Sequence, residues 1–385
     1  MRFVPTDSHR ERRKEARTFV KELVAPRART LDHEERYPAE ILDALGERRL
    51  TGLTIPESHG GRGEGLVELT ILIEELSTAL MPVASALGLH LGVAAEIETL
   101  GSNALREEFL PSMARFETVG ALGLTEANAG SDTFAMETTA RQDGDEWVLS
   151  GSKQWVTNFL NADVVLTYAK TGPDTEKPHN VSAFLVPTER FTPVTTWETL
   201  GARCVKSVAV SLDDVRVPDD RRVGADGTAY VRRGEAGIGV NLPARGVGLA
   251  RAALADTTAF VIDEGLIDPS TSSRVAENQS LRHRLAEMSA QVDTARLHTL
   301  RAADVLDRGA AAGHELSMAK IVATEAAVDV TNEALRIHGE AGYTTDHDVE
   351  RYVRDARLLP IAGGPNDGHR NALADDVLNG GAPSP

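Results

Sequence analysis

The chain has 385 residues, of which 41% are apolar and 26% charged, the composition of a globular protein with two or three domains. Its 58 acidic residues exceed its 41 lysines and arginines, so the net charge is −17. This charge repels nucleic-acid phosphates and anionic lipid, and no apolar run near the roughly 20 residues needed to cross a bilayer is visible. We therefore expect no nucleic-acid partner and no membrane association.

The amino terminus and the cysteine content indicate the cellular compartment in which the protein is expected. Residues 1–13 are polar and basic and lack the apolar core of a secretory signal. Cys204 is the single cysteine, so no intrachain disulfide can form and a reducing cytoplasm is expected. Because Cys204 precedes a strand-like run, we interpret it as a buried, inert thiol rather than a nucleophile.

The first part of the chain shows apolar residues at helical spacing. This spacing predicts helices around residues 16–24, 41–45, 66–80 and 94–116. Glycines at 60, 61 and 63 interrupt the pattern. No Gly-Lys-Ser/Thr follows them, so they indicate a structural turn rather than a phosphate-binding loop.

Short β-like runs separated by turn residues begin at Val119. They cover residues 119–125, 137–141, 146–149, 164–168, 181–186 and 208–212. Asp143-Gly144-Asp145 is a hairpin signal. Gly151 is expected to follow the end of the third run, and residues 213–218 to lead out of the region. The pattern predicts a compact, mostly antiparallel β-domain.

Helical patterning returns beyond about Gly234. Apolar residues spaced by four and three between Leu281 and Ala295 form a heptad seam. A further helix is predicted from Glu315 to Ile337, ended by Gly339, and a shorter one over 349–358. The predicted organisation is mainly α with a central β-domain: an N-terminal helical domain over 1–118, a middle β-domain over 119–232 and a C-terminal helical bundle over 233–385.

Two segments of the β-region carry residues suited to a flavin ring. Residues 124–132 read LTEANAGSD, and residues 153–158 read KQWVTN. A flat isoalloxazine needs hydrogen-bond donors along its edge, and an aromatic wall that excludes water from the reacting face. Thr125, Ser131, Trp155 and Thr157 supply hydroxyls and one indole for these two tasks.

Together and in this order, the two segments resemble the acyl-CoA dehydrogenase family. The resemblance covers nearly the full chain and includes residues 55–61, 214–218 and 350–357, with Gly342-Tyr343 between the last two. It implies an N-terminal helical domain, a β-barrel-like middle domain and a C-terminal four-helix bundle. It also implies FAD between the last two, and a neighbouring subunit over the adenosine end of the cofactor. A homodimer or homotetramer is therefore expected.

The same resemblance assigns the flavin contacts residue by residue. Thr125 is implied to be a flavin donor, and Ser131 a donor to flavin or substrate. Trp155 is implied to be the aromatic wall and Thr157 the partner of flavin N5. The full set implied to bind the cofactor is Leu124, Thr125, Gly130, Ser131, Trp155 and Thr157, and no metal is expected.

The chain departs from the family at the catalytic base. The family reaction removes a proton beside a thioester carbonyl while hydride leaves the next carbon for the flavin. In most relatives the base is a Glu shortly after the Arg-Asp-Ala-Arg segment, and Gly363 stands at that position here. Some relatives place the base near the start of the first long C-terminal helix, where this chain has Ile238 or a close neighbour. The backbone N–H of Gly363 still remains as a donor to the thioester carbonyl.

Three other side chains are candidates for a relocated base. Glu235 precedes Ile238 by about one helical turn, although an acid there also suits the positive end of a helix dipole. Asp367 and His369 follow Gly363 closely, and each is otherwise interpreted as a solvated polar residue.

A second departure concerns the far end of the flavin. Relatives carry an Arg-x-x-Phe-Gly segment before the heptad helix, whereas residues 263–274 here read as a polar loop. Glu340 also replaces the second glycine of a Gly-Gly pair, and an inward carboxylate would repel phosphate. Weaker or rearranged FAD binding is expected.

Three functions remain open on the sequence. The first is an acyl thioester dehydrogenase with a relocated or absent base, acting on CoA or carrier-protein thioesters and passing electrons to an electron-transfer flavoprotein or to oxygen. The second is a flavin enzyme of specialised metabolism with other chemistry, such as oxygenation. The third is a partner subunit of a hetero-oligomeric dehydrogenase. The cluster of flavin-edge donors favours a flavoenzyme, and fold analogy favours an acyl thioester substrate.

Overall fold

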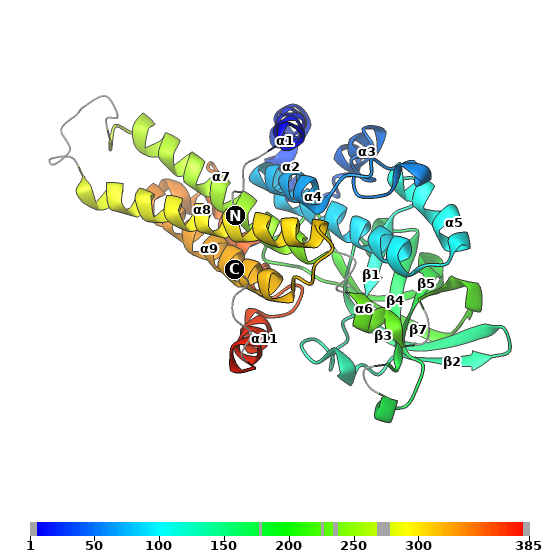
Figure 1. The fold of residues 1–385 in the computed structure, drawn as a ribbon. Coiled ribbons are helices and arrows are strands. Elements are labelled where there is room, and N and C mark those ends of the chain that lie inside the picture. Colours follow the sequence, from blue (N-terminus) through cyan, green and yellow to red (C-terminus); the bar gives the residue numbers. More distant parts are fainter. Residues whose placement is uncertain (1–5, 177–178, 225–226, 234–237, 268–277, 380–385) are drawn as a thin grey trace.

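One β-sheet domain lies next to two groups of helices in this protein (Figure 1). The computed structural model describes residues 6–176, 179–224, 227–233, 238–267 and 278–379. The N-terminal helices lie on one side of the sheet, and the long C-terminal helices form a bundle beside it (Figure 1). The predicted class, mainly α with a central β-domain, is confirmed.

Five helices make up the N-terminal part. They are α1 (Asp7–Phe19), α2 (Ala28–His33), α3 (Ala39–Glu47), α4 (Leu66–Leu100) and α5 (Asn103–Ala114). The first helix predicted from the sequence spans two elements, because α1 ends at Phe19 and a π-helical stretch, Val20–Val24, continues the chain. The turn at Gly60 has φ +81°, a conformation that glycine adopts readily.

Helix α4 corrects two sequence predictions. We expected separate helices over 66–80 and 94–116, but α4 runs for 35 residues and contains a kink at Leu80 (φ −151°, ψ 92°), just before Pro82. Nearly every side of α4 is buried, so its apolar residues show no helical period. By length and apolar content, α4 is the one helix in the described ranges that could cross a membrane. Its most apolar window is 83% buried inside the fold, as is usual for a core helix.

The β-domain is an eight-stranded sheet. Its strands are β1 (Gly120–Gly123), β2 (Thr139–Asp143), β3 (Glu146–Thr157), β4 (Val164–Lys170), β5 (Val181–Pro187), β6 (Thr192–Thr196), β7 (Ser207–Pro218) and β8 (Arg222–Val223). The order is β6-β7-β3-β2-β4-β5-β8, with β1 paired to β4 in parallel. Most other pairings are antiparallel, and the β2–β3 hairpin turns at Gly144 as predicted.

Two strand limits were wrong. Strand β3 continues through Gly151 to Thr157, because a bulge there keeps it paired with β7. Gly151 has φ +150°, and a Cβ on it would lie 2.5 Å from Thr138 Oγ1, so a glycine is required. Residues 213–218 belong to β7 rather than to an exit segment.

The C-terminal part begins after the short helix α6 (Thr228–Arg232). Its helices are α7 (Asn241–Asp263), α8 (Gln279–Asp307), α9 (Gly313–His338), α10 (Val349–Ala356) and α11 (Asn366–Leu378). The heptad seam of α8 is confirmed, with Leu281, Met288 and Val292 buried. Helices α7, α8 and α9 pack on one another and α4 packs against α7, which joins the two helical parts.

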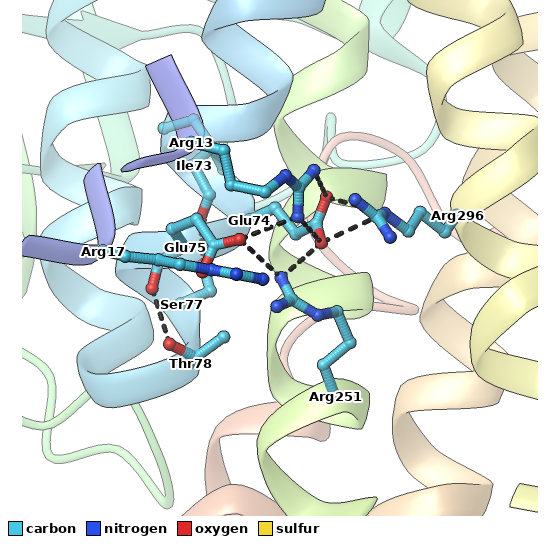
Figure 2. Close-up of polar contacts among 9 residues, drawn as sticks. All are labelled: Arg13, Arg17, Ile73, Glu74, Glu75, Ser77, Thr78, Arg251 and Arg296. Carbon is cyan, nitrogen blue, oxygen red and sulfur yellow. Dashed lines mark hydrogen bonds and ion pairs between the residues drawn. The ribbon is translucent and has the colours of Figure 1, made fainter. Parts of the chain in front are cut away.

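A buried ion network fixes four of these helices together (Figure 2). Glu74 of α4 accepts hydrogen bonds from Arg13 of α1, Arg251 of α7 and Arg296 of α8. Burial would raise the pKa of Glu74, but the guanidinium groups of Arg251, Arg296 and Arg13 outweigh that effect and lower it. Arg13 Nη1 also lies 2.7 Å from Oε1 of Glu75. The network therefore consists of ionised, mutually paired groups.

Candidate active site

The fold brings the two flavin-type segments side by side at the end of β1 and along β3. The backbone N–H of Gln154 donates to the carbonyl of Thr125 at 2.7 Å. Lys153, fully buried, donates to the carbonyl of Leu124 at 3.3 Å and to Glu126 Oε1 at 2.6 Å. Residues 124–126 and 153–154, nearly thirty positions apart in the sequence, are thus in direct contact.

The Lys153–Glu126 pair is a part of the site that sequence reasoning missed. Burial lowers the pKa of Lys153 to about 8, while attraction to Lys153 outweighs burial and lowers the pKa of Glu126. The two groups are therefore ionised together at neutral pH. Glu126 also accepts the backbone N–H groups of Glu137 and Thr138.

Trp155 presents its indole on the surface of the β-domain. Its side chain is 51% exposed, and its backbone has φ +59°, which is uncommon for a bulky residue. The indole stacks on that of Trp197, with ring centroids 4.9 Å apart. Nε1 of Trp197 is buried and has no hydrogen-bond partner among the described residues. An exposed aromatic face beside an unpaired donor is suited to a planar ligand.

Both segments carry hydroxyl groups. Thr157 Oγ1 lies 2.8 Å from Ser207 Oγ. Thr125 is half-buried and Ser131 exposed, and within the described ranges neither hydroxyl has a side-chain hydrogen bond. Around Gly130, a Cβ would meet nothing within 4 Å. The hydroxyls of Thr125 and Ser131 and the exposed indole are the kinds of group that the edge and face of an isoalloxazine require.

Gly363 lies in a turn between α10 and α11 that faces α7. Its backbone is left-handed (φ +65°), and an ideal Cβ on it would lie 2.3 Å from Leu242 Cδ1. Lys320 of α9 supports the turn by donating to the carbonyls of Leu359 at 2.8 Å and Gly364 at 3.4 Å. Burial, with the nearby charge of Arg245 adding to it, lowers the pKa of Lys320 to about 8.

The candidates for a relocated base lie in different surroundings. His369 Nε2 lies 3.4 Å from the carbonyl oxygen of Gly363, and Nδ1 lies 3.2 Å from Ser317 Oγ. Asp367 is exposed and pairs with Arg370 at 3.1 Å. Glu235 falls outside the described residues. Ile238 begins a short 3-10 turn, Ile238–Val240, before α7.

Other singled-out residues lie away from this cluster. Cys204 is buried, and desolvation raises the pKa of its thiol well above its usual value, which agrees with an inert thiol. Glu340 is exposed at the end of α9. The loop predicted over 263–274 begins after α7 and falls mostly outside the described ranges.

Two surface hollows do not coincide with the cluster. One, of about 200 Å³, is lined by residues of α4 and its surroundings, including Leu66, Ala94 and Asp307. The other, of about 270 Å³, lies between α8 and α9 and is lined by residues including Arg284 and Asn332. Neither hollow is lined by Thr125, Ser131, Trp155 or Thr157.

Three matches to family models follow the architecture along the chain. Residues 6–117 match the N-terminal domain of acyl-CoA dehydrogenase, residues 121–215 its middle domain and residues 240–378 its C-terminal domain. The chain belongs to the acyl-CoA dehydrogenase family. It is an oxidoreductase of the acyl-CoA dehydrogenase type, a FAD-dependent class of enzyme.

Individual relatives match over nearly their whole length. An acyl-CoA dehydrogenase of Bacillus subtilis is 31% identical, covering 96% of this chain and 97% of the relative. A glutaryl-CoA dehydrogenase of Desulfococcus multivorans is 34% identical, with 95% of each covered. The structure of butyryl-CoA dehydrogenase from Megasphaera elsdenii superposes with a TM-score of 0.91 at 29% identity, covering 98% of this chain and 100% of that one.

Proposed function

We propose that the protein binds FAD at the cluster around Trp155 and oxidises an acyl thioester carried on CoA or a carrier protein. Electrons would pass to an electron-transfer flavoprotein or to oxygen. The observation that supports this proposal is the hydrogen bond from the backbone N–H of Gln154 to the carbonyl of Thr125, which brings the two segments together next to Trp155. When bound, FAD would supply the hydride acceptor.

The protein's own groups would orient the substrate and exclude water. The stacked indoles of Trp155 and Trp197 would shield one face of the reacting region, and Thr125, Ser131 and Thr157 would hold the ring edge. The N–H of Gly363 would bind the thioester carbonyl oxygen and stabilise the charge that develops there. A proton acceptor is still required at the adjacent carbon.

We propose His369 as the base that the described residues best support. Among Asp367 and His369, only the histidine turns toward Gly363. Burial lowers the pKa of His369 below its usual value, with the nearby charge of Lys320 also lowering it. The imidazole is therefore neutral at pH 7. Its Nε2–H donates to the carbonyl of Gly363, so the nitrogen that would accept the proton is Nδ1, which lies beside Ser317 Oγ. Glu235 stays the proposal from the sequence.

The decisive experiment is anaerobic flavin bleaching by acyl-CoAs, compared among variants. If His369 is the base, His369→Gln should slow bleaching by about 10²–10⁴-fold, whereas Glu235→Gln should not. The exposed His283 provides the matched control, His283→Gln. The opposite ranking would assign the base to Glu235.

Two other experimental outcomes would favour a different function. Gly363 and Gly364 place no carboxylate where most relatives carry the base, which favours oxygenation as the second candidate. A hydroxylated product with matching oxygen consumption would select it. A colourless protein that cannot be reconstituted with FAD would instead select the partner-subunit role.

A further inference from the structure

Arg245 of α7 is a buried cation with no acid beside it. Only 5% of its surface is exposed, and Nη1 donates to Ser85 Oγ at 2.8 Å. Its Nε is buried without a partner, and within the described ranges no carboxylate forms an ion pair with it. By contrast Arg251, further along α7, binds both Glu74 and Glu75. Helix α7 therefore pairs the half-buried Arg251 with two carboxylates and leaves the buried Arg245 without one.

A buried guanidinium without a counter-charge is unfavourable. Burial lowers the pKa of Arg245 to about 10, with no neighbouring acid opposing the effect. Among the charged groups, Arg245 has the largest effect on the pKa of Lys320, and it lowers that pKa because both side chains are cations. Two cations thus share a buried region where no acid of the described chain neutralises Arg245.

Two asparagines converge on the same turn of α4 that Arg245 reaches. Asn158 donates from Nδ2 to the carbonyl of Ala86 at 2.9 Å, and its Oδ1 is buried without a partner. The amide of Asn241 packs against Gly88, where a Cβ would lie 1.5 Å from Asn241 Nδ2, and its Oδ1 is also unpaired. Buried polar atoms are normally satisfied, so this group of unpaired atoms is suited to a polar ligand.

The cluster adjoins the proposed reacting region. Leu242, which contacts the Gly363 position, lies one turn before Arg245 on α7. Asn158 follows Thr157 at the end of β3, and Lys320 holds the turn that contains Gly363. The unpaired groups of Arg245 and Asn241 therefore lie between α4 and α7, near the turn that contains Gly363.

We propose that Arg245 binds a carboxylate at the far end of the acyl group, so that the substrate is the thioester of a dicarboxylic acid. This proposal rests on the proposed function. A guanidinium matches a carboxylate with two parallel hydrogen bonds and neutralises its charge. The amide of Asn241 would hydrogen-bond to the same polar end. A plain alkyl chain would leave Arg245 unpaired.

The test is substrate binding by the FAD-loaded enzyme, measured by calorimetry. The probes are the CoA thioesters from succinyl-CoA to suberoyl-CoA, each compared with the neutral straight-chain thioester of the same carbon number. Wild type should bind at least one acidic thioester more tightly than its neutral counterpart. Arg245→Met should weaken that acidic thioester by about 10- to 100-fold and leave the neutral one unchanged.

Controls separate recognition from folding. Arg190→Met, at an exposed arginine of the β-domain, should change neither affinity. Arg245→Lys keeps the charge and should retain part of the preference. Without ligand, the melting temperature of Arg245→Met should not fall, because the substitution removes an unpaired buried charge.

The outcomes distinguish the two proposals. Equal binding of acidic and neutral thioesters by wild type, or equal weakening of both by Arg245→Met, would overturn the carboxylate proposal while the dehydrogenase function stands. If no thioester binds or bleaches the flavin, the proposed function and this inference fall together.

Discussion

Gly363 offers a direct way to test where the reacting carbon lies. Its left-handed backbone makes any side chain cost about 1–2 kcal/mol, and the atom that a Cβ would meet, Leu242 Cδ1, is the end of a flexible side chain. The protein should therefore tolerate Gly363→Glu. In the His369→Gln background, which lacks the proposed base, stopped-flow bleaching should become about 10²–10⁴-fold faster with this new base.

Gly363→Gln is the matched control, because it has the same size and cannot accept the proton. In the same background it should bleach no faster than His369→Gln alone. Equal rates for the Glu and Gln variants, with substrate still bound, would show that position 363 does not face the reacting carbon.

His90 should make the stability depend on pH. It is fully buried in α4, accepts the N–H of Gly120 at Nδ1 and lies 3.0 Å from the carbonyl of Met113 at Nε2. Burial lowers its pKa to about 4, whereas the unfolded chain takes up a proton near 6.5. The unfolded state thus binds more protons between these values, and stability falls as pH drops from about 6.5 toward 4.

Urea unfolding at pH 7 and pH 5 measures this effect. The His90 contribution should lower the free energy of unfolding of wild type by about 2 kcal/mol over this interval. His90→Gln should lack that contribution. The effects of all other titrating groups on the free energy of unfolding are the same in the two proteins, so they cancel when the two are compared. Parallel losses in both would exclude His90 as the source.

Individual site residues were predictable to different degrees. Thr125 and Trp155 were predicted from their types and order, and the structure places them on one surface. Lys153 and Glu126 were overlooked because a buried ion pair depends on which strands lie together, and the sequence does not state that. Arg245 was missed for a related reason, since its lack of an acid partner exists only in the folded chain.

At the scale of elements, the buried network in Figure 2 should be a main source of stability. Glu74→Gln would leave Arg13, Arg251 and Arg296 without their shared carboxylate. We expect a loss of about 3–5 kcal/mol in the free energy of unfolding, measured in urea.

The matched control is Glu117→Gln, which alters an exposed Glu–Arg pair with Arg115. Exposed pairs contribute little, so this variant should unfold like wild type. Similar losses in both variants would contradict a special role for the buried network.

Element limits were less predictable than element types. The heptad seam of α8 was recognised because only one of its faces is buried. Helix α4 was divided in two because burial on all sides removes the helical period, and Pro82 sits within it. Strand β6 was missed because all its residues are exposed and none alternates with a buried one.

At the scale of the whole molecule, exposed apolar residues support the proposed homodimer or homotetramer. Leu297 of α8 is 60% exposed on the bundle. Light scattering on the eluting protein should give the mass of a dimer or tetramer, and Leu297→Glu should lower that mass by adding a charge to a buried contact.

Val194→Glu is the matched control, because Val194 of β6 is 63% exposed on the β-domain instead. It should leave the mass unchanged. A monomeric wild type, or a mass that neither variant changes, would remove the support that Leu297 gives to assembly through α8.

The stacked pair of Trp155 and Trp197 has an optical consequence. The chain has three tryptophans, and two of them form this pair, while Trp147 lies in the same sheet with its Nε1 bonded to Asp219 at 2.7 Å. Indole emission overlaps flavin absorption, so an arriving FAD would quench nearly all of the intrinsic fluorescence. Intrinsic tryptophan fluorescence should therefore measure FAD binding and release in real time, without an added label.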